Sequence, residues 1–242
     1  MSAIQTEGLT KRYGKRTAVD DLNLKINRGE IFALLGMNGA GKTTVIRMLA
    51  GLTRPSAGEA RIGEYSIVDT PQAVKGRIGV SPQETAVAPR LTVRENLELI
   101  CGIYGFSKSE SHKKIAGLAE QFHLQDILSR KAGKLSGGWQ RRVSIAMALI
   151  GEPSVLFLDE PTLGLDVLAR QELWEIIRGL QGKITVVLTT HYMEEAQALS
   201  DRIGILKDGS LLMVATPKEL MEKTGCDSVE QAFIAIVKEG KA

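Results

Sequence analysis

Residues 36–44 read Gly-Met-Asn-Gly-Ala-Gly-Lys-Thr-Thr and could bind a chain of phosphate groups. The segment matches the pattern GxxxxGK[ST], in which small residues let successive backbone N–H groups point at phosphate oxygens. A helix that follows such a loop presents its positive end to the same anion. Lys42 could reach the β- and γ-phosphates, and the Thr43 hydroxyl could bind Mg²⁺. We therefore predict a nucleotide site made by Gly36, Met37, Asn38, Gly39, Ala40, Gly41, Lys42, Thr43 and Thr44.

Two acidic residues, Asp159 and Glu160, directly follow the apolar run 154–158. Open α/β folds bind ligands at the carboxyl ends of their strands, so both acids should lie at the same edge as residues 36–44. Asp159 could hold Mg²⁺ through water beside Thr43, and Glu160 could orient and polarise a water molecule that attacks the γ-phosphate. The pair therefore predicts phosphate hydrolysis.

His191 follows a further apolar run, residues 184–189, and Thr190. A lone histidine after a strand more often caps the strand or packs in a core than takes part in catalysis. Here its position favours a contact with the γ-phosphate, so His191 joins Lys42 and Glu160 as a candidate catalytic residue.

These residues need a parallel sheet to bring them together. The runs 31–35, 155–158 and 184–188 lack polar alternation, which is typical of strands buried on both faces of such a sheet. Segments with helical patterns lie between them, which predicts an open α/β fold. The expected helices span residues 43–52, 139–150, 167–180 and 193–199.

Two further regions should form smaller lobes. Residues 4–10 and 21–26 favour antiparallel strands of a small second sheet packed against the main one. Between residues 92 and 130 the apolar residues recur at helical intervals, which indicates a helical insertion. The chain shows no internal repeat and no low-complexity linker, so we expect one domain with lobes.

Composition excludes several classes of protein. The chain has 242 residues, 43% of them hydrophobic, and a formal net charge of +3, so no electrostatic footprint for nucleic acid is expected. Cys101 and Cys226 are far apart and have no Cys/His spacing, which indicates neither a disulfide framework nor a zinc site and fits a reducing cytoplasm. No apolar stretch approaches the ~18 residues of a membrane span, so contact with a membrane requires a partner.

Residues 135–138, Leu-Ser-Gly-Gly, resemble the signature motif of the ATP-binding-cassette (ABC) family. A serine hydroxyl and glycine amides at a helix N-terminus make a second anion site in a chain that already has one. The resemblance implies two cassettes packed head to tail, in which Ser136, Gly137 and Gly138 act in trans on ATP held by the other cassette. It also implies ATP and Mg²⁺ as the cofactors, and a P-loop NTPase fold with a mainly parallel RecA-like core sheet, an antiparallel β subdomain and a helical subdomain.

Other positions match the same family in the expected order, between about residues 3 and 215. Tyr13 resembles the aromatic residue that stacks on adenine. Gln83 resembles the Q-loop glutamine, which implies a catalytic role and a contact with Mg²⁺. Asp166 resembles the D-loop aspartate at the dimer interface, and His191 resembles the switch histidine.

The chain departs from the family at three of these places. Trp139 stands where glutamine is frequent after the signature. Leu163 and Val167 stand where serine and proline are frequent around the D-loop. None of these changes removes a catalytic group. Trp139 could pack at the dimer interface or against the helical lobe, and it puts the geometry of dimer closure in doubt.

The resemblance also implies a division of the cassette into lobes. The β lobe is expected at residues 1–30 and 53–75, and the helical lobe with the signature at 84–150. The core is expected at 31–52, 76–83 and 151–215, followed by a helical tail at 216–242.

The implied partners are a second ABC ATPase subunit, in a homodimer or a heterodimer, and an integral-membrane permease. The permease would dock near Gln83 and the helical lobe, which begins around residues 91–97, and would hold the chain on the cytoplasmic face of the membrane. Residues 228–234 resemble the closing helix of bacterial exporter-type ATPases, including drug and sodium exporters. An amphipathic helix that merely covers the cassette edge is an equally weighted interpretation.

Two other functions remain open at this point. A soluble ABC ATPase of iron–sulfur cluster assembly has a single cassette of similar size and would leave the nucleotide chemistry intact. A nucleotide-binding module without turnover is the other alternative. The presence of every hydrolytic residue favours an ATPase.

Overall fold

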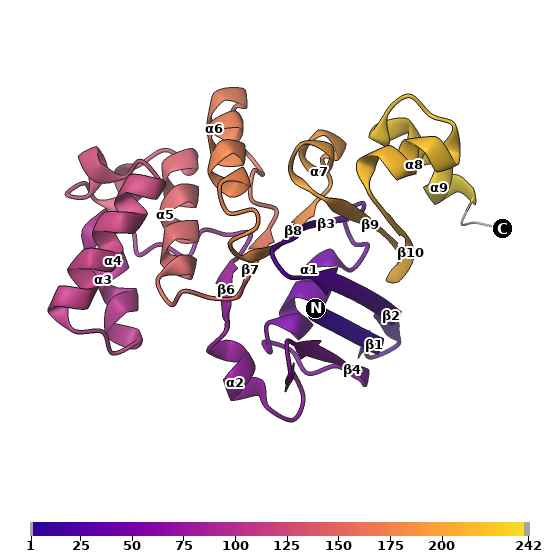
Figure 1. Cartoon of the computed structure of the whole chain (residues 1–242), viewed down its shortest axis with the longest axis horizontal. Helices are drawn as coiled ribbons and strands as arrows, with labels where there is room; N and C mark the ends of the chain where they lie inside the picture. The colour runs from indigo at the N-terminus through magenta and orange to yellow at the C-terminus, as the bar shows by residue number, and fades with distance from the viewer. Residues whose placement is uncertain (1, 240–242) are drawn as a thin grey trace.

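A six-stranded, mainly parallel sheet lies at the centre of the computed structural model, which describes residues 2–239 (Figure 1). Its strand order is β10-β9-β3-β8-β7-β6, and all neighbours are parallel except β9 and β10. The strands are β3 (Ile31–Leu35), β6 (Ile78–Ser81), β7 (Val155–Asp159), β8 (Thr185–Thr190), β9 (Arg202–Lys207) and β10 (Ser210–Ala215). The predicted α/β fold with a largely parallel core is confirmed.

Successive residues of the central strands enter two different hydrophobic cores, because side chains alternate across a sheet. In β3, Ala33 and Leu35 pack with the helices of one face, whereas Phe32 and Leu34 pack with the second sheet and the helix that follows β3. All five residues of β3 and all six of β8 are buried. Burial on both faces explains why these runs show no polar alternation in the sequence.

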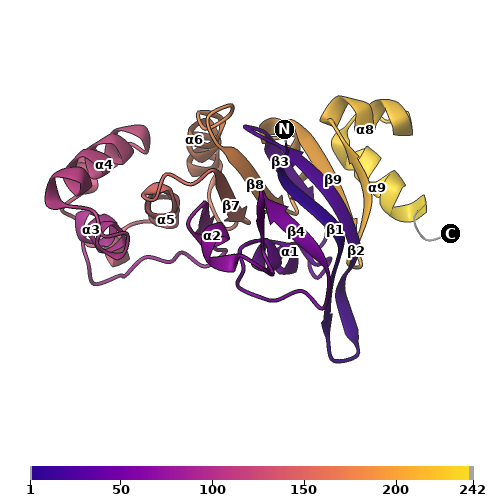
Figure 2. The same cartoon turned by 60° about the horizontal axis from the view of Figure 1, so that its bottom comes forward.

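The second sheet is antiparallel and has the order β2-β1-β4-β5. Its strands are β1 (Ser2–Tyr13), β2 (Arg16–Asn27), β4 (Ala57–Ile62) and β5 (Tyr65–Ser66). The sequence predicts shorter first strands, at 4–10 and 21–26. The extra polar residues pair through their backbones in a hairpin, with Tyr13 opposite Arg16, and Figure 2 shows this hairpin projecting beyond the rest of the sheet.

Three longer helices form a lobe at one end of the molecule, at the left of Figure 1. They are α3 (Val93–Ile103), α4 (Lys108–Gln121) and α5 (Gly137–Leu149), and short 3₁₀ turns at Gln125–Ile127 and Ala132–Lys134 connect α4 to α5. Capping boxes begin two of them, with Thr92 and Glu95 at α3 and Ser107 and Glu110 at α4. Each box satisfies backbone N–H groups that a helix leaves free at its start.

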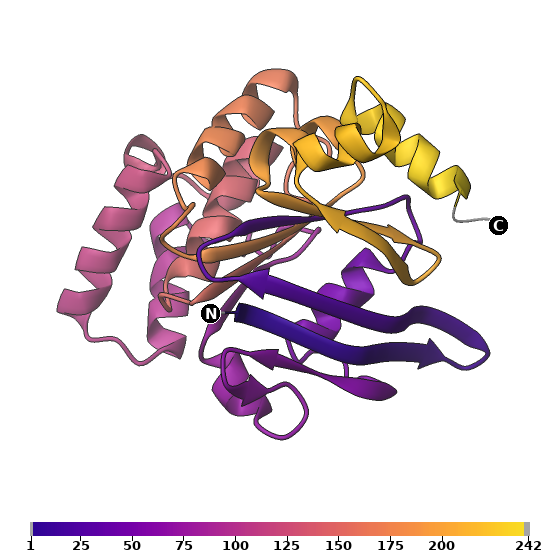
Figure 3. The ribbon, with the colours of Figure 1, turned by 45° about the vertical axis from the view of Figure 1, so that its right-hand side comes forward.

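The other helices cover the sheet faces and its far edge. They are α1 (Lys42–Leu49), α2 (Pro71–Lys75), α6 (Val167–Arg178), α7 (Met193–Leu199), α8 (Pro217–Thr224) and α9 (Val229–Glu239). Figure 3 shows α8 and α9 together beside α7 and the antiparallel strand β10. Among residues 2–239, no helix is long and apolar enough to span a membrane.

The helix after the phosphate loop is shorter than the predicted range of 43–52. It begins at Lys42 and ends at Leu49, because Gly51 adopts the left-handed conformation with φ 66°. A glycine in this conformation just beyond a helix is a common way of ending it.

Helix α5 lies directly on β6. A Cβ atom at Gly79 of β6 would lie 2.2 Å from the carbonyl oxygen of Ala148 on α5, far inside van der Waals contact. The glycine therefore lets the helix and the strand approach backbone to backbone.

We expect Gly79→Ala to destabilise the fold by roughly 1–3 kcal/mol, because β6 or α5 must move to admit the methyl group. Gly117→Ala is the matched control, since Gly117 is an exposed residue inside α4 and an added Cβ there meets nothing within 4 Å. The control should stabilise by about 0.5–1 kcal/mol. Urea unfolding of both variants measures the difference, and equal effects would contradict this account of the contact.

Candidate functional site

A cleft of about 740 Å³ opens where β3, β7 and β8 end. It contains most of the residues that the sequence singles out, although they come from segments up to 178 positions apart. The lining residues are Tyr13, Arg16, Ala18, Asn38, Gly39, Ala40, Gly41, Lys42, Thr43, Thr44, Gln83, Glu160, Leu163 and His191.

The loop between β3 and α1 depends on two glycines. Gly41 adopts φ 105°, and a Cβ atom there would lie 2.4 Å from the carbonyl oxygen of Ala18. A Cβ atom at Gly36 would lie 2.4 Å from the carbonyl oxygen of Leu206. Any larger residue at either place would push the loop away from the β lobe or from β9, so the loop holds its curve only with glycine.

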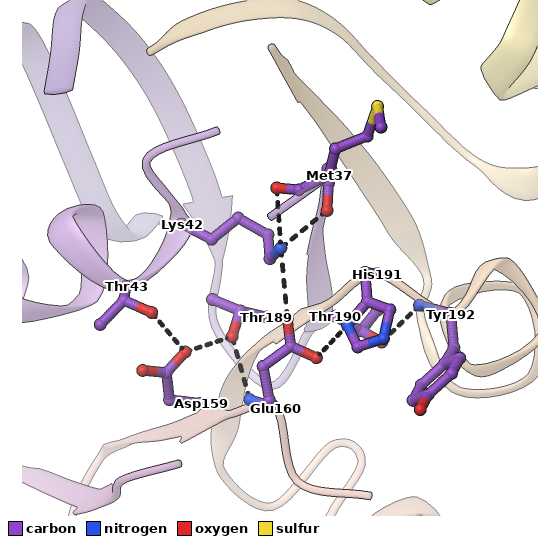
Figure 4. A network of polar contacts seen from close by, with 10 residues as sticks. Met37, Lys42, Thr43, Asp159, Glu160, Thr189, Thr190, His191 and Tyr192 are labelled. Atoms are coloured by element: carbon purple, nitrogen blue, oxygen red, sulfur yellow. Dashed lines mark hydrogen bonds and ion pairs between the residues drawn. The ribbon is translucent and has the colours of Figure 1, made fainter. Parts of the chain in front are cut away.

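Lys42 extends its ammonium group back over this loop (Figure 4). The Nζ atom donates to the carbonyl oxygens of Gly36, at 2.7 Å, and Met37, at 3.3 Å, and lies 3.2 Å from Oε1 of Glu160. The side chain is only 6% exposed. Within the loop, the partners of this buried cation are neutral carbonyl oxygens. The ammonium group is therefore well placed to bind an incoming phosphate.

Asp159 ends β7 and is held by two hydroxyl groups. Thr43 Oγ1 donates to Asp159 Oδ1 at 3.1 Å, and Thr189 Oγ1 donates to the same oxygen (Figure 4). The other carboxylate oxygen has no protein partner in this network. The Thr43 hydroxyl and the Asp159 carboxylate therefore converge, and both are the hard oxygen ligands that Mg²⁺ prefers.

Glu160 follows immediately, in a strained backbone conformation with φ 48°. Its N–H donates to the carbonyl oxygen of Thr189 at 3.1 Å and to the Thr189 hydroxyl at 3.0 Å. Its carboxylate joins Lys42 on one oxygen and His191 Nδ1 on the other, at 2.8 Å. Left-handed backbone at a residue other than glycine is uncommon and concentrates at functional sites, where neighbouring bonds maintain it.

Two predicted residues lie at the rim. Tyr13 is 47% exposed at the end of β1, and the Lys11 ammonium lies 5.0 Å from the centre of its ring. Gln83 follows β6 and also lines the cleft. Met37 is 65% exposed and does not line the cleft, although its backbone carbonyl contacts Lys42.

The signature residues and Asp166 do not line this cleft. Ser136 is the N-cap residue of α5, and a Cβ atom at Gly138 would lie 3.0 Å from the Ala169 side chain. Asp166 caps α6 by accepting a hydrogen bond from the N–H of Ala169 at 2.9 Å. The starts of α5 and α6 are therefore packed against each other, away from the phosphate loop of the same chain.

Trp139 turns toward the groove between α5 and α6. The guanidinium of Arg142 lies 4.4 Å from the centre of its ring and also pairs with Glu172 of α6. The indole of Trp139 packs against the hydrophobic core that the helical lobe shares with the sheet. Of the two places that the sequence suggests for Trp139, the described chain shows the contact with the helical lobe.

Four residues of the site are not among the site residues that the sequence predicts. Arg16, Ala18 and Leu163 line the cleft, and Thr189 holds both Asp159 and the Glu160 backbone. The sequence offers one signal for Thr189, because Thr189 and Thr190 end an otherwise apolar run immediately before His191. Arg16 and Ala18 enter only because the β hairpin folds over the phosphate loop.

Behind the cleft lies a fully buried carboxyl group, Glu195 of α7. Trp174 Nε1 donates to its Oε1 at 3.2 Å, whereas Oε2 has no hydrogen-bond partner, and the buried hydroxyl of Thr162 has none either. Burial raises the pKa of Glu195, and the charge of Glu160 raises it further, against the opposing effect of nearby hydroxyl and indole groups.

The matching family model is the one described as ABC transporter, and it matches residues 19–163 of this chain. Among curated proteins, the chain is 44% identical to the doxorubicin resistance ATP-binding protein DrrA of Mycobacterium tuberculosis, over 92% of this chain and 68% of that protein. It is 42% identical to the Nod factor export ATP-binding protein I of Ralstonia nicotianae, over 94% and 71% of the two chains.

The fold is also found among solved structures. The ATP-binding cassette MJ0796, in a dimeric post-hydrolysis state bound to ADP and Pi, superposes with a TM-score of 0.78 and is 29% identical. The superposition covers 88% of this chain and 98% of that one.

Glu195 should make stability depend on pH. A raised pKa in the folded state means that the folded chain holds this proton more tightly than the unfolded chain does, so stability falls as pH rises above the ordinary value of 4.5. Glu195→Gln removes the titration and keeps the shape. We expect its melting temperature to exceed that of the wild type at pH 8 and the difference to shrink toward pH 4.5. A difference that is constant with pH would contradict a buried, proton-binding Glu195.

Proposed function

The chain belongs to the ABC transporter family as an ATP-hydrolysing subunit, and from this premise we propose how its residues bind ATP, cleave it and drive transport. One observation carries the proposal. The Glu160 carboxylate lies between Lys42 and His191 in the same cleft where Thr43 meets Asp159. A cation for phosphate, a carboxylate for water and oxygen ligands for a metal thus converge in one place.

We propose that ATP lies in this cleft with its phosphates on residues 36–44 and its adenine against Tyr13. The backbone N–H groups and the start of α1 would hold the phosphates. Thr43, Gln83 and, through water, Asp159 would hold Mg²⁺, and the Thr43–Asp159 distance of 3.1 Å supports this. Bound Mg²⁺ supplies neutralisation of charge on the β- and γ-phosphates.

The contacts of Glu160 support a role as the base that orients the attacking water. Its Oε1 is paired with Lys42, and phosphate oxygens would compete for the same ammonium group. Once Lys42 turns to phosphate, Oε1 becomes available to accept a hydrogen bond from water. His191 holds the other oxygen through Nδ1 and leaves its Nε2 atom for the γ-phosphate side.

We further propose that each site is completed by a second cassette. Ser136, Gly137 and Gly138 lie outside the cleft of their own chain, at the start of α5, where a helix N-terminus favours an anion. Asp166 lies beside them. The dimeric cassette MJ0796 gives a precedent for closure between two chains. Two copies of this chain, or this chain with a homologue, would preserve the same chemistry.

We propose that ATP hydrolysis by this chain drives a conformational change in a membrane permease, and that the complex is an exporter. The relatives include a doxorubicin resistance protein and a Nod factor export protein, which favours transport over iron–sulfur cluster assembly. The permease would dock near Gln83 and the helical lobe. There, Leu99 and Ile103 of α3 are 49% and 73% exposed, which is apolar surface available to a partner. The chain would thus act on the cytoplasmic face of the membrane.

Glu160→Gln should retain ATP binding and lower kcat by at least about 100-fold, because the amide no longer polarises water. The same variant should form a stable dimer in ATP, visible by size-exclusion chromatography. Glu152→Gln, which changes an exposed carboxylate outside the cleft, is the matched control and should keep normal turnover. Unchanged hydrolysis in Glu160→Gln would show that another residue orients the water.

The transport role can be tested in the native cell. A tagged chain should co-purify with a polytopic membrane protein after extraction in mild detergent, and Ile103→Asp should reduce that recovery without loss of ATP binding. Recovery only in the soluble fraction, with assembly factors, would contradict transport while leaving the ATPase chemistry intact.

A further inference from the structure

Helix α5 contacts the segment 79–85 from Gln140 to Ala148. The close approach of Ala148 and Gly79 marks one end. The hydroxyls of Ser144 and Ser81 lie 2.9 Å apart one turn nearer the signature. At the other end, Thr85 Oγ1 donates to Oε1 of Gln140 at 3.4 Å. The helix that begins with the signature and the loop that carries Gln83 therefore lie side by side.

The central link in this row is Arg141. Its NH1 group donates to the carbonyl oxygen of Pro82 at 2.6 Å, and its NH2 group donates to that of Gln83 at 2.5 Å. The residue is 4% exposed. Only a guanidinium presents two donors in a fixed fork that can bridge consecutive carbonyl groups, whereas an ammonium is a single point charge on a flexible stem.

Arg141 remains a cation although it is buried. Burial lowers the pKa of Arg141, and nearby acidic groups, Asp159 first, offset part of this effect. Arginine remains charged in any protein environment, so this guanidinium is a permanent cation held against the Gln83 loop. Its neighbour Arg142 is equally buried but faces Glu172 on α6 instead.

We propose that Arg141 is a positioning residue that clamps the backbone of Gln83 to the signature helix. The Gln83 side chain lines the cleft, so a change in its position on ATP binding would pass through the clamp to α5 and to Ser136 at its start. The inference rests on the proposed function, because it assumes that Gln83 and the signature act in ATP hydrolysis. It adds Arg141 as the residue through which ATP in the cleft of one chain would move the signature, which that chain presents to the ATP site of its partner.

The clamp can be tested first without ATP. Arg141→Met removes both donors but keeps an apolar side chain of similar length, and Arg142→Met is the matched control on the same helix. Hydrogen–deuterium exchange should become at least about tenfold faster in a peptide covering residues 80–90 of Arg141→Met, because the loop loses two charge-assisted hydrogen bonds. The control should leave this peptide unchanged. Equal protection in the two variants would overturn the clamp, whatever the ATPase activity.

The second measurement separates positioning from general damage. In Arg141→Met, the dissociation constant for ATP should stay within about twofold of the wild type, while kcat falls by about 10- to 100-fold, since the phosphate loop is intact and Gln83 is displaced. Arg141→Lys keeps the positive charge but can contact at most one of the two carbonyl oxygens. It should therefore recover only part of the lost kcat. A parallel loss of ATP affinity and kcat in Arg141→Met, or the same kcat in Arg142→Met, would overturn the positioning role.

The two hypotheses fail in different ways. If the wild-type chain hydrolyses ATP and the Arg141 variants give the same exchange and kcat as Arg142→Met, the clamp is wrong and the proposed function stands. If wild-type chain binds but does not hydrolyse ATP, the proposed function is wrong, while the exchange experiment still decides whether Arg141 fixes residues 80–90.

Discussion

The parallel hydrogen bonding of β8 between β3 and β7 is the constraint on which the site depends. In this register Leu35 lies opposite Thr190, and Asp159 lies opposite Thr189, so the three strands end at one edge. The phosphate loop, the acids and His191 each follow one of these ends. A slip of one residue would turn the Thr189 side chain to the other face of the sheet and away from Asp159.

The charged groups at this edge are buried, which is costly unless each has partners. Lys42 and Glu160 are 6% and 5% exposed, and they share an ion pair, loop carbonyls and the His191 ring. The strained Glu160 backbone is held by Thr189 from the neighbouring strand. Because these partners are already in place, the site can exchange one of them for phosphate with little rearrangement of the sheet.

The helical lobe connects to the site by one strand and one helix. Strand β6 is an edge strand of the sheet, so it has a neighbouring strand on only one side, and α5 packs directly against it. An edge strand can shift more readily than β3 or β8, which are bonded on both sides. The loop after β6 can therefore move with the helical lobe while the central strands of the core stay fixed.

The phosphate loop, the Asp159–Glu160 pair, the α/β class and the family resemblance are all predictable from the sequence, because each depends on residue types at short fixed spacings. It also located most of the strands and helices, with errors at their ends where hairpin pairing or a glycine decides. Three contacts become visible only once the chain is folded: Thr189 holds both acids, Arg16 reaches the cleft, and Arg141 binds the Gln83 backbone. Thr189 is 29 and 30 positions from the two acids, and Arg141 is 58 positions from Gln83. No local sequence pattern records such distances, because the sheet register and the packing of α5 set them.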